Sequence, residues 1–165
     1  MRIRLPRLER RNERHYVAIR THVTRPELSS KLPPLIGELA AWLDARGEAP
    51  TGAPFFRYLF IGEDGHFDID VGFPVAHAIA SDDRVTMSIL PAGHYAVTIH
   101  TGPYDQLRDA TAALKRWAAE NGVQWDASDD ETRWGARIES YLTDPTTEPD
   151  PEKWQTEIAI RTKDA

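Results

Sequence analysis

The sequence predicts an α+β domain built from two tandem β-α-β-β repeats, related by pseudo-twofold symmetry, with a ligand cleft at the centre. The first observation is an internal similarity, because HYVAIRTHV (His15–Val23) resembles HYAVTIHTG (His94–Gly102). Each of these strand-like segments precedes an amphipathic helical segment that stops at a glycine, and two further strand patterns follow. We therefore expect one domain over residues 1–165, with repeat one at about 1–80 and repeat two at about 84–165.

The first half is expected to contain a helix over about Leu32–Arg46. Leucine and isoleucine recur there at three- and four-residue steps, which makes one apolar stripe, and Gly47 suits the C-terminal cap. Two adjacent prolines near the start fit only the first turn of a helix. Two strand patterns follow, at 54–62 and 66–75, and a polar turn with two glycines joins them.

The second half repeats this order. A helix is expected over about Tyr104–Asn121, and Gly122 is its C-terminal cap. Strand patterns follow at 135–145 and 153–161, joined by a loop rich in Pro, Thr, Asp and Glu. A further pairing strand is expected at 85–90, just before the second repeat opens.

The composition narrows the function classes. The 165 residues carry 26 acidic and 20 basic side chains, a net charge of -6, and no cysteine. Without cysteine there are no disulfides, thiolate metal sites, iron–sulfur clusters or cysteine nucleophiles. An acidic chain lacks the basic footprint of direct nucleic-acid binding. The charged N-terminus and the lack of a long apolar run lead us to expect a cytoplasmic protein without a membrane partner.

No metal site and no cofactor are expected. The six histidines show no metal-ligand spacing with another His, Asp or Glu. The sequence contains no phosphate loop, nucleophile elbow or dinucleotide fingerprint. A haem carrier is a further alternative because a haem-binding family shares this type of fold, but no residue stands out as an axial ligand.

The strand pattern near residue 139 holds the candidate chemistry. Alternation places Arg137, Glu139 and Tyr141 on one face and the apolar Ile138 on the other. A carboxylate beside an aromatic side chain inside a strand is typical of two situations. One is a solvated sheet face, with Glu139 free or paired with Arg137, and the other is a binding pocket.

The repeat extends this candidate site to aromatic residues. Aligning FRYL with ESYL places Phe56 and Tyr58 at the positions of Glu139 and Tyr141. Tyr58 and Tyr141 are therefore expected to line the two halves symmetrically. Core packing is the alternative role for every aromatic side chain. The remaining candidates are Trp134, at the mouth of the cleft, and Trp154, at the start of the last strand.

Other repeat-related pairs have less specific roles. Asp70 matches Glu157, and Glu157 is a candidate to reach the cleft. A cross-strand or sheet-edge pair is the alternative for both carboxylates. Trp42 and Trp117 occupy matching places on the two helices, and we assign both to packing.

The sequence resembles the GyrI-like small-molecule-binding domain, which is also the effector-binding module of AraC-type and MerR-type multidrug-responsive regulators. The similar stretches follow the family's order and together cover nearly the whole chain. They are HYVAIRTHV, FDIDVGFPV, LPAGHYAVTIHTGPYDQL, IESYLTDP and WQTEIAI.

The resemblance implies a drug-binding cleft between the two halves, lined by aromatic side chains. It also implies that a glutamate of the second repeat faces this cleft, and by position that residue is Glu139, with Tyr141 beside it. The strand would then turn its apolar face, with Ile138, to the helix and its Glu139 face to the ligand.

The resemblance further implies a binding protein for lipophilic, often cationic or aromatic compounds, protective against toxins or antibiotics. The regulators also carry a helix-turn-helix domain, for which this chain has no room, so a stand-alone binder is expected. The alternative is a GyrI-like hydrolase of reactive cyclopropane-bearing DNA-alkylating compounds, with Glu139 and Tyr141 as catalytic residues. A module that contacts a protein partner such as gyrase is a further alternative.

Overall fold

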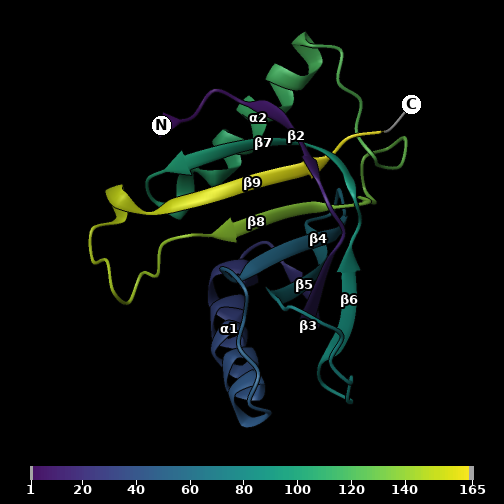
Figure 1. Ribbon diagram of the computed structural model, residues 1–165. Helices are drawn as coiled ribbons and strands as arrows, with labels where there is room; N and C mark the ends of the chain where they lie inside the picture. Colours follow the sequence, from purple (N-terminus) through teal and green to yellow (C-terminus); the bar gives the residue numbers. More distant parts are fainter. Residues whose placement is uncertain (1, 164–165) are drawn as a thin grey trace.

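The computed structural model describes residues 2–163 as a curled antiparallel sheet with two helices (Figure 1). The strands follow the order β1-β7-β9-β8-β4-β5-β3-β6, and β2 also pairs with β7. The fold is therefore α+β, as predicted. The strands are β1 (Arg2–Ile3), β2 (Arg7–Arg11), β3 (Arg14–Thr24), β4 (Phe55–Ile61), β5 (His66–Pro74), β6 (Thr86–Leu90), β7 (Gly93–Thr101), β8 (Arg137–Tyr141) and β9 (Gln155–Arg161).

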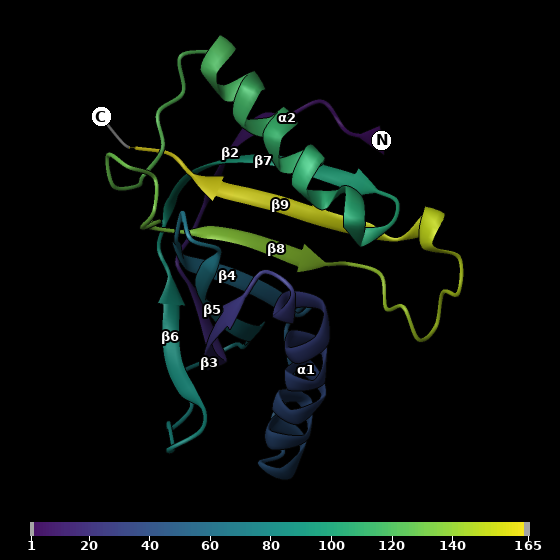
Figure 2. The same ribbon diagram turned by 180° about the vertical axis from the view of Figure 1, so that it is seen from behind.

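Both helices lie on the same face of the sheet (Figure 2). Helix α1 (Glu27–Ala45) contacts β3 and β5, and its leucines pack among the apolar side chains of those strands. Helix α2 (Leu107–Glu120) follows a 3₁₀ turn at Tyr104–Gln106 and contacts β7. Strands β4 and β8, at the centre of the sheet, therefore lie between the two helix-covered regions.

Helix α1 begins earlier than the prolines predicted. Pro33 and Pro34 lie inside the helix, in its second turn after the start at Glu27. A proline removes the hydrogen bond to the carbonyl four residues before it. The carbonyls affected belong to Ser29 and Ser30, and both residues are exposed, so water can replace the lost donors.

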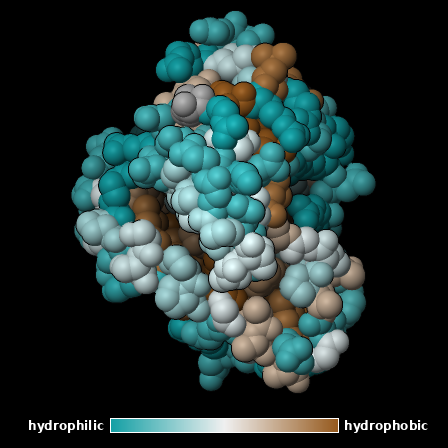
Figure 3. Space-filling view, turned by 90° about the vertical axis from the view of Figure 1, so that its left-hand side faces the viewer, coloured by the Kyte–Doolittle hydropathy of each residue, from teal (hydrophilic) through white to brown (hydrophobic). Residues whose placement is uncertain are grey.

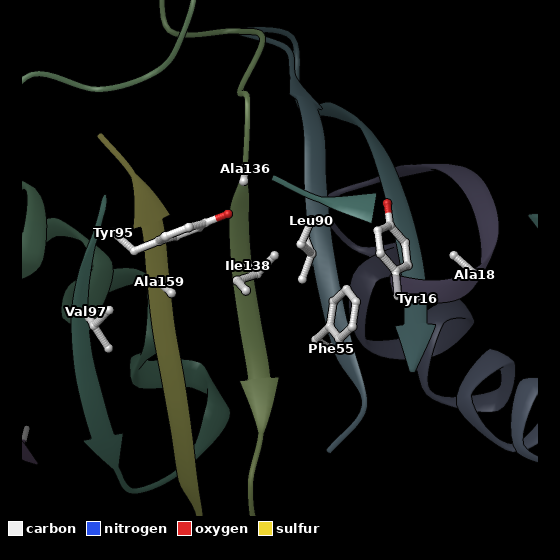
Figure 4. Packing of buried hydrophobic residues seen from close by; sticks show 9 residues of the cluster. All are labelled: Tyr16, Ala18, Phe55, Leu90, Tyr95, Val97, Ala136, Ile138 and Ala159. Atoms are coloured by element: carbon white, nitrogen blue, oxygen red, sulfur yellow. The ribbon is translucent and has the colours of Figure 1, made fainter. Parts of the chain in front are cut away.

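The face of the sheet opposite the helices carries its own apolar cluster. Tyr16, Phe55, Tyr95 and Ile138 are buried there, on four different strands (Figure 4). The prediction that Ile138 faces a helix is therefore wrong. The helices cover the other face of the sheet. Glu139 lies on that face, because successive residues of β8 alternate between the two faces.

Strands from the first and the second half of the chain meet where β4 pairs with β8. Three residue pairs register there, with Phe56 opposite Glu139 at the centre. The predicted pairing strand at 85–90 is present as β6, beside β3. Strands β1 and β2 were not anticipated, and they add to β7 along the outer edge. In the part of the chain that is described, neither helix has the length and apolar character needed to cross a membrane.

Candidate functional site

Glu139 lies at the centre of the sheet and accepts two tyrosine hydroxyls on one oxygen. The Tyr58 hydroxyl on β4 and the Tyr141 hydroxyl on β8 each donate to Glu139 Oε1 at 2.8 Å. Tyr141 reaches it along the same strand face, two residues away, and Tyr58 reaches it across the β4–β8 pairing. All three side chains are partly buried, so the contact is shielded from water but not closed to it.

The electrostatics of this cluster favour neutral tyrosines beside the carboxylate. Burial, followed by the charge of Glu139, raises the pKa of Tyr58 and of Tyr141 well above 10. Both hydroxyls therefore remain donors over the physiological range. The second oxygen, Glu139 Oε2, has no hydrogen-bond partner within residues 2–163, and it is not sealed from solvent.

A row of aromatic rings extends from this carboxylate. Phe56 and Tyr141 meet edge to face with centroids 4.8 Å apart, and Tyr141 meets Tyr104 at 5.5 Å. Tyr104 in turn lies 4.7 Å from Trp154. The row crosses from β4 to the start of α2 and to the beginning of β9. Such a row offers ring faces and edges for stacking with an aromatic or cationic group.

Arg137 and Trp134 lie at the other end of the β8 face. The Arg137 guanidinium stacks over the Trp134 ring at 4.5 Å, and Trp134 is buried against α2. Burial lowers the pKa of Arg137, while the charge of Glu139 opposes this effect. The site is therefore acidic and aromatic at its centre and cationic at one end.

The structure brings together most of the residues that the sequence singled out. Phe56, Tyr58, Glu139 and Tyr141 form one contact group, and Trp154 joins it through Tyr104. Trp134 is separate from this group, because it packs beside Arg137, Trp125 and α2. The roles of these residues in binding remain predictions.

Sequence reasoning missed Tyr104 as a site residue, because it placed Tyr104 at the start of the second helix. Its place in a 3₁₀ turn before that helix allows it to reach Trp154 and Tyr141 instead. The local signal was Pro103, which follows the predicted strand segment His94–Gly102 and directly precedes Tyr104.

The two repeat-related carboxylates lie away from this site. Glu157 is on the opposite face of the sheet, where it pairs with Arg11 at 2.9 Å. Asp70 is fully buried, where it accepts the Tyr16 hydroxyl at 2.7 Å and pairs with Arg20 at 2.8 Å. For both carboxylates the pairing alternative is the one observed.

Two hollows lie on the face of the sheet opposite the helices. One measures about 220 Å³ and has a mixed polar and apolar lining. It contains none of the six predicted ligand-binding residues. The lining of the larger hollow is Arg11, Arg14, Ala53, Phe55, Ser140, Leu142 and Glu157.

Figure 3 shows the molecule edge-on, from the side of the β8–β9 loop. The surface on this side is hollowed, with apolar atoms inside.

Within residues 2–163, no three His, Asp or Glu side chains lie close enough together to hold a metal ion. A carboxylate with one open oxygen can attract a cation or take up a proton, and aromatic rings can stack on a flat ligand.

Comparison with known structures shows the same fold. The C-terminal domain of EcmrR is 24% identical, with a TM-score of 0.79, and the match covers 98% of each chain. In the EcmrR–DNA complex the match spans only 58% of the EcmrR chain. SAV2435 bound to tetraphenylphosphonium is 11% identical, with a TM-score of 0.68 over 97% of this chain and 94% of that one.

A hydrolase from Listeria innocua is 13% identical, with a TM-score of 0.63 over 96% of this chain and 91% of that one. A comparison with curated proteins found no matching relative. The family model described as the GyrI-like small molecule binding domain matches residues 5–163. This chain therefore belongs to the GyrI-like small molecule binding domain family.

Proposed function

We propose that the protein binds lipophilic, often cationic or aromatic small molecules at the Glu139 site, in a cleft between its two β-α-β-β halves. The observation that carries this proposal is the open oxygen of Glu139. Tyr58 and Tyr141 hold the other oxygen in place, so the carboxylate is oriented while Oε2 has no partner within residues 2–163. The aromatic row beside it supplies surfaces for a flat ligand.

The physical terms favour broad specificity. A cation about 4 Å from a carboxylate gains about 4 kcal/mol at an effective dielectric constant of 20, before the loss of hydration is counted. Each ring face adds about 0.5–2 kcal/mol for a cation, depending on how dry the contact is. Neither term needs a particular hydrogen-bonding pattern in the ligand. Compounds that share charge and flat apolar surface would therefore bind with similar strength.

The family and one neighbour support this ligand class. GyrI-like domains bind small molecules, and SAV2435, with the same fold, was solved with the lipophilic cation tetraphenylphosphonium. The sheet order β7-β9-β8-β4-β5-β3 is the order expected if two similar halves meet at the β4–β8 pairing. In the cytoplasm, a binder of this kind would lower the free concentration of a toxin or an antibiotic.

A hydrolase is the second candidate. Glu139 could take a proton from the attacking water as a general base, and Tyr141, whose hydroxyl contacts this carboxylate, could give its proton to the leaving group and regain one from Glu139. A neighbour with the same fold is described as a hydrolase, which agrees with this candidate. Reactive cyclopropane-bearing DNA-alkylating compounds are the substrate class that we assign to it. A binder returns its ligand unchanged, whereas a hydrolase returns a product that is heavier by one water molecule.

The test is a fluorescence-anisotropy titration with rhodamine 123, a lipophilic cation, followed by mass measurement of the recovered dye. Glu139→Gln keeps the size of the side chain and an oxygen for the two hydroxyls, but it removes the charge. We expect it to weaken binding about 10- to 100-fold, or about 1.4–2.8 kcal/mol. Glu157→Gln is the matched control, because it changes a strand glutamate on the opposite face.

Equal affinities for the wild-type protein and Glu139→Gln would disprove the assignment of the site. Loss of affinity in Glu157→Gln with retention in Glu139→Gln would move the site to the opposite face of the sheet. A recovered dye of unchanged mass supports the binder, and a separate incubation with a cyclopropane-bearing electrophile tests the hydrolase by the mass of its product.

A further inference from the structure

Arg137 is a partly buried cation in the proposed site, and within residues 2–163 it has no hydrogen-bond or ion-pair partner. Its guanidinium group makes no hydrogen bond and no ion pair with any residue in 2–163, and its nitrogens are not sealed from solvent. The inference that follows depends on the proposed function, because it concerns the ligand of the same site.

The other partly buried arginines, unlike Arg137, each have a hydrogen-bond or ion-pair partner within residues 2–163, although the Nε of Arg57 has none. Arg11 pairs with Glu157 at 2.9 Å, and Arg161 pairs with Asp126 at 2.9 Å. Arg57 donates to the Tyr16 hydroxyl and to a backbone carbonyl. Burial without a partner is costly for a charged group, so a guanidinium left open in a site suggests that something outside the chain completes it.

Arg137 is held in place although its donors are open. Its guanidinium group stacks on Trp134 at 4.5 Å, and Trp134 is fixed by packing against α2 and by donating its indole N–H to the Glu131 carbonyl at 3.0 Å. Stacking uses the flat face of the guanidinium group and leaves its edge, where the N–H donors lie, free for a ligand.

Arg137 and Glu139 share one face of β8 and are two residues apart. Residues separated in this way along a strand are about 6.6 Å apart. Each side chain keeps an open hydrogen-bonding edge, since no ion pair joins them within 4.0 Å. The site therefore presents a negative and a positive group side by side, with aromatic rings at both ends.

We propose that Arg137 determines specificity, and that the preferred ligands are aromatic zwitterions that carry a carboxylate as well as a basic group. The basic group lies against Glu139 and the carboxylate against Arg137. A guanidinium edge matches the two oxygens of a carboxylate, and charge-assisted bonds of this kind are stronger than those to a neutral acceptor. A purely cationic ligand would be attracted by Glu139 and repelled by Arg137.

The test uses two dyes that differ at one group. Rhodamine 110 carries a free carboxylate, and rhodamine 123 is its methyl ester and a pure cation. Equilibrium dialysis at pH 7.5 and low salt gives both dissociation constants, with total dye read by absorbance after acidification. For the wild-type protein we expect rhodamine 110 to bind at least fivefold more tightly than rhodamine 123.

Arg137→Gln should change the two affinities in opposite directions. Rhodamine 110 should bind about tenfold more weakly, because its carboxylate loses the guanidinium group, and rhodamine 123 should bind two- to fivefold more tightly, because a repelling charge is gone. General damage to the site would weaken both dyes. Arg137→Lys keeps the charge and should retain part of the preference, which keeps the test valid if the glutamine variant does not fold.

Arg133→Gln is the matched control, because Arg133 lies just before β8 and is placed over the Phe60 ring at 5.1 Å, but is exposed. It should leave the ratio of the two affinities unchanged. The proposal is overturned if wild-type protein prefers the ester, or if both Arg137 variants keep the wild-type ratio while rhodamine 123 still depends on Glu139. Failure of both dyes to bind would overturn the proposed function as well.

Discussion

Removing the hydroxyls of Tyr58 and Tyr141 tests the geometry on which the site depends. Each hydroxyl donates to Glu139 Oε1 at 2.8 Å, and phenylalanine at either position keeps the ring and removes only this donor. The ring contacts of Tyr141 with Phe56 and Tyr104 should survive the change. The effect on stability therefore reports on the hydrogen bond to the carboxylate.

The expected magnitude follows from the charge of the acceptor. Hydrogen bonds to charged groups contribute a net 1.5–3 kcal/mol, and the lower value suits a site that is only partly buried. We therefore expect each single variant to lower the free energy of unfolding by about 1.5 kcal/mol. With a urea dependence of about 2 kcal/mol per molar for a chain of this size, the midpoint should fall by roughly 0.7 M.

The double variant should lose more than the sum of the two single losses. When one hydroxyl is removed, the other can still satisfy Oε1, but removal of both leaves a partly desolvated carboxylate without a donor. We expect an excess of about 0.5–1 kcal/mol in the double-mutant cycle.

The assay is urea unfolding at pH 7.5, followed by the fluorescence of the five tryptophans. Tyr104→Phe is the control, because Tyr104 shares the aromatic row and its hydroxyl makes no hydrogen bond within residues 2–163. It should change the free energy of unfolding by less than about 0.5 kcal/mol. If Tyr58→Phe and Tyr141→Phe behave like Tyr104→Phe, the two hydroxyls do not stabilise the carboxylate and our account of the site is wrong.

Three further predictions concern the rest of the fold. Burial and then the charge of Asp70 raise the pKa of Tyr16 to about 12, so the folded state keeps a proton that the unfolded state loses near pH 10. Stability should therefore fall by about 2–3 kcal/mol between pH 10 and pH 12, and urea unfolding of Tyr16→Phe should show a shallower fall. Gly37→Ala, inside α1 with open space at its Cβ, should raise the free energy of unfolding by about 0.5–1 kcal/mol, and Gly47→Ala, at a φ of +67°, should lower it by about 1 kcal/mol. Gly72→Ala would place a Cβ 2.9 Å from the Phe55 ring, and a loss of about 1–3 kcal/mol is expected, with thermal melting as the measurement.

Strand alternation predicted correctly which side chains share a face of β8, but not what covers each face. Arg137, Glu139 and Tyr141 lie together as expected. The helix was assigned to the side of Ile138, and the structure places it on the other side. Alternation divides side chains into two sets, and β8 is central enough to be buried on both, so hydrophobicity alone does not indicate where a helix packs.

Contacts between distant segments were the least predictable part of the site. Tyr104 and Trp154 are 50 residues apart in sequence, and their ring contact depends on how the 3₁₀ turn and the start of β9 meet. Arg137 was considered only as a partner for Glu139, because a sequence does not show whether two charges on one strand face reach each other. Burial and stacking on Trp134 become visible only in three dimensions.

The pairing of β4 with β8 has a mechanical consequence. Three registered residue pairs hold these strands together, whereas nine join β3 to β5. Under a pulling force that separates the two halves, this junction should yield before the longer pairings on either side. A ligand that contacts both Tyr58 on β4 and Glu139 on β8 would add a link across this short pairing. The force needed to separate the halves should then increase with the fraction of protein that has ligand bound.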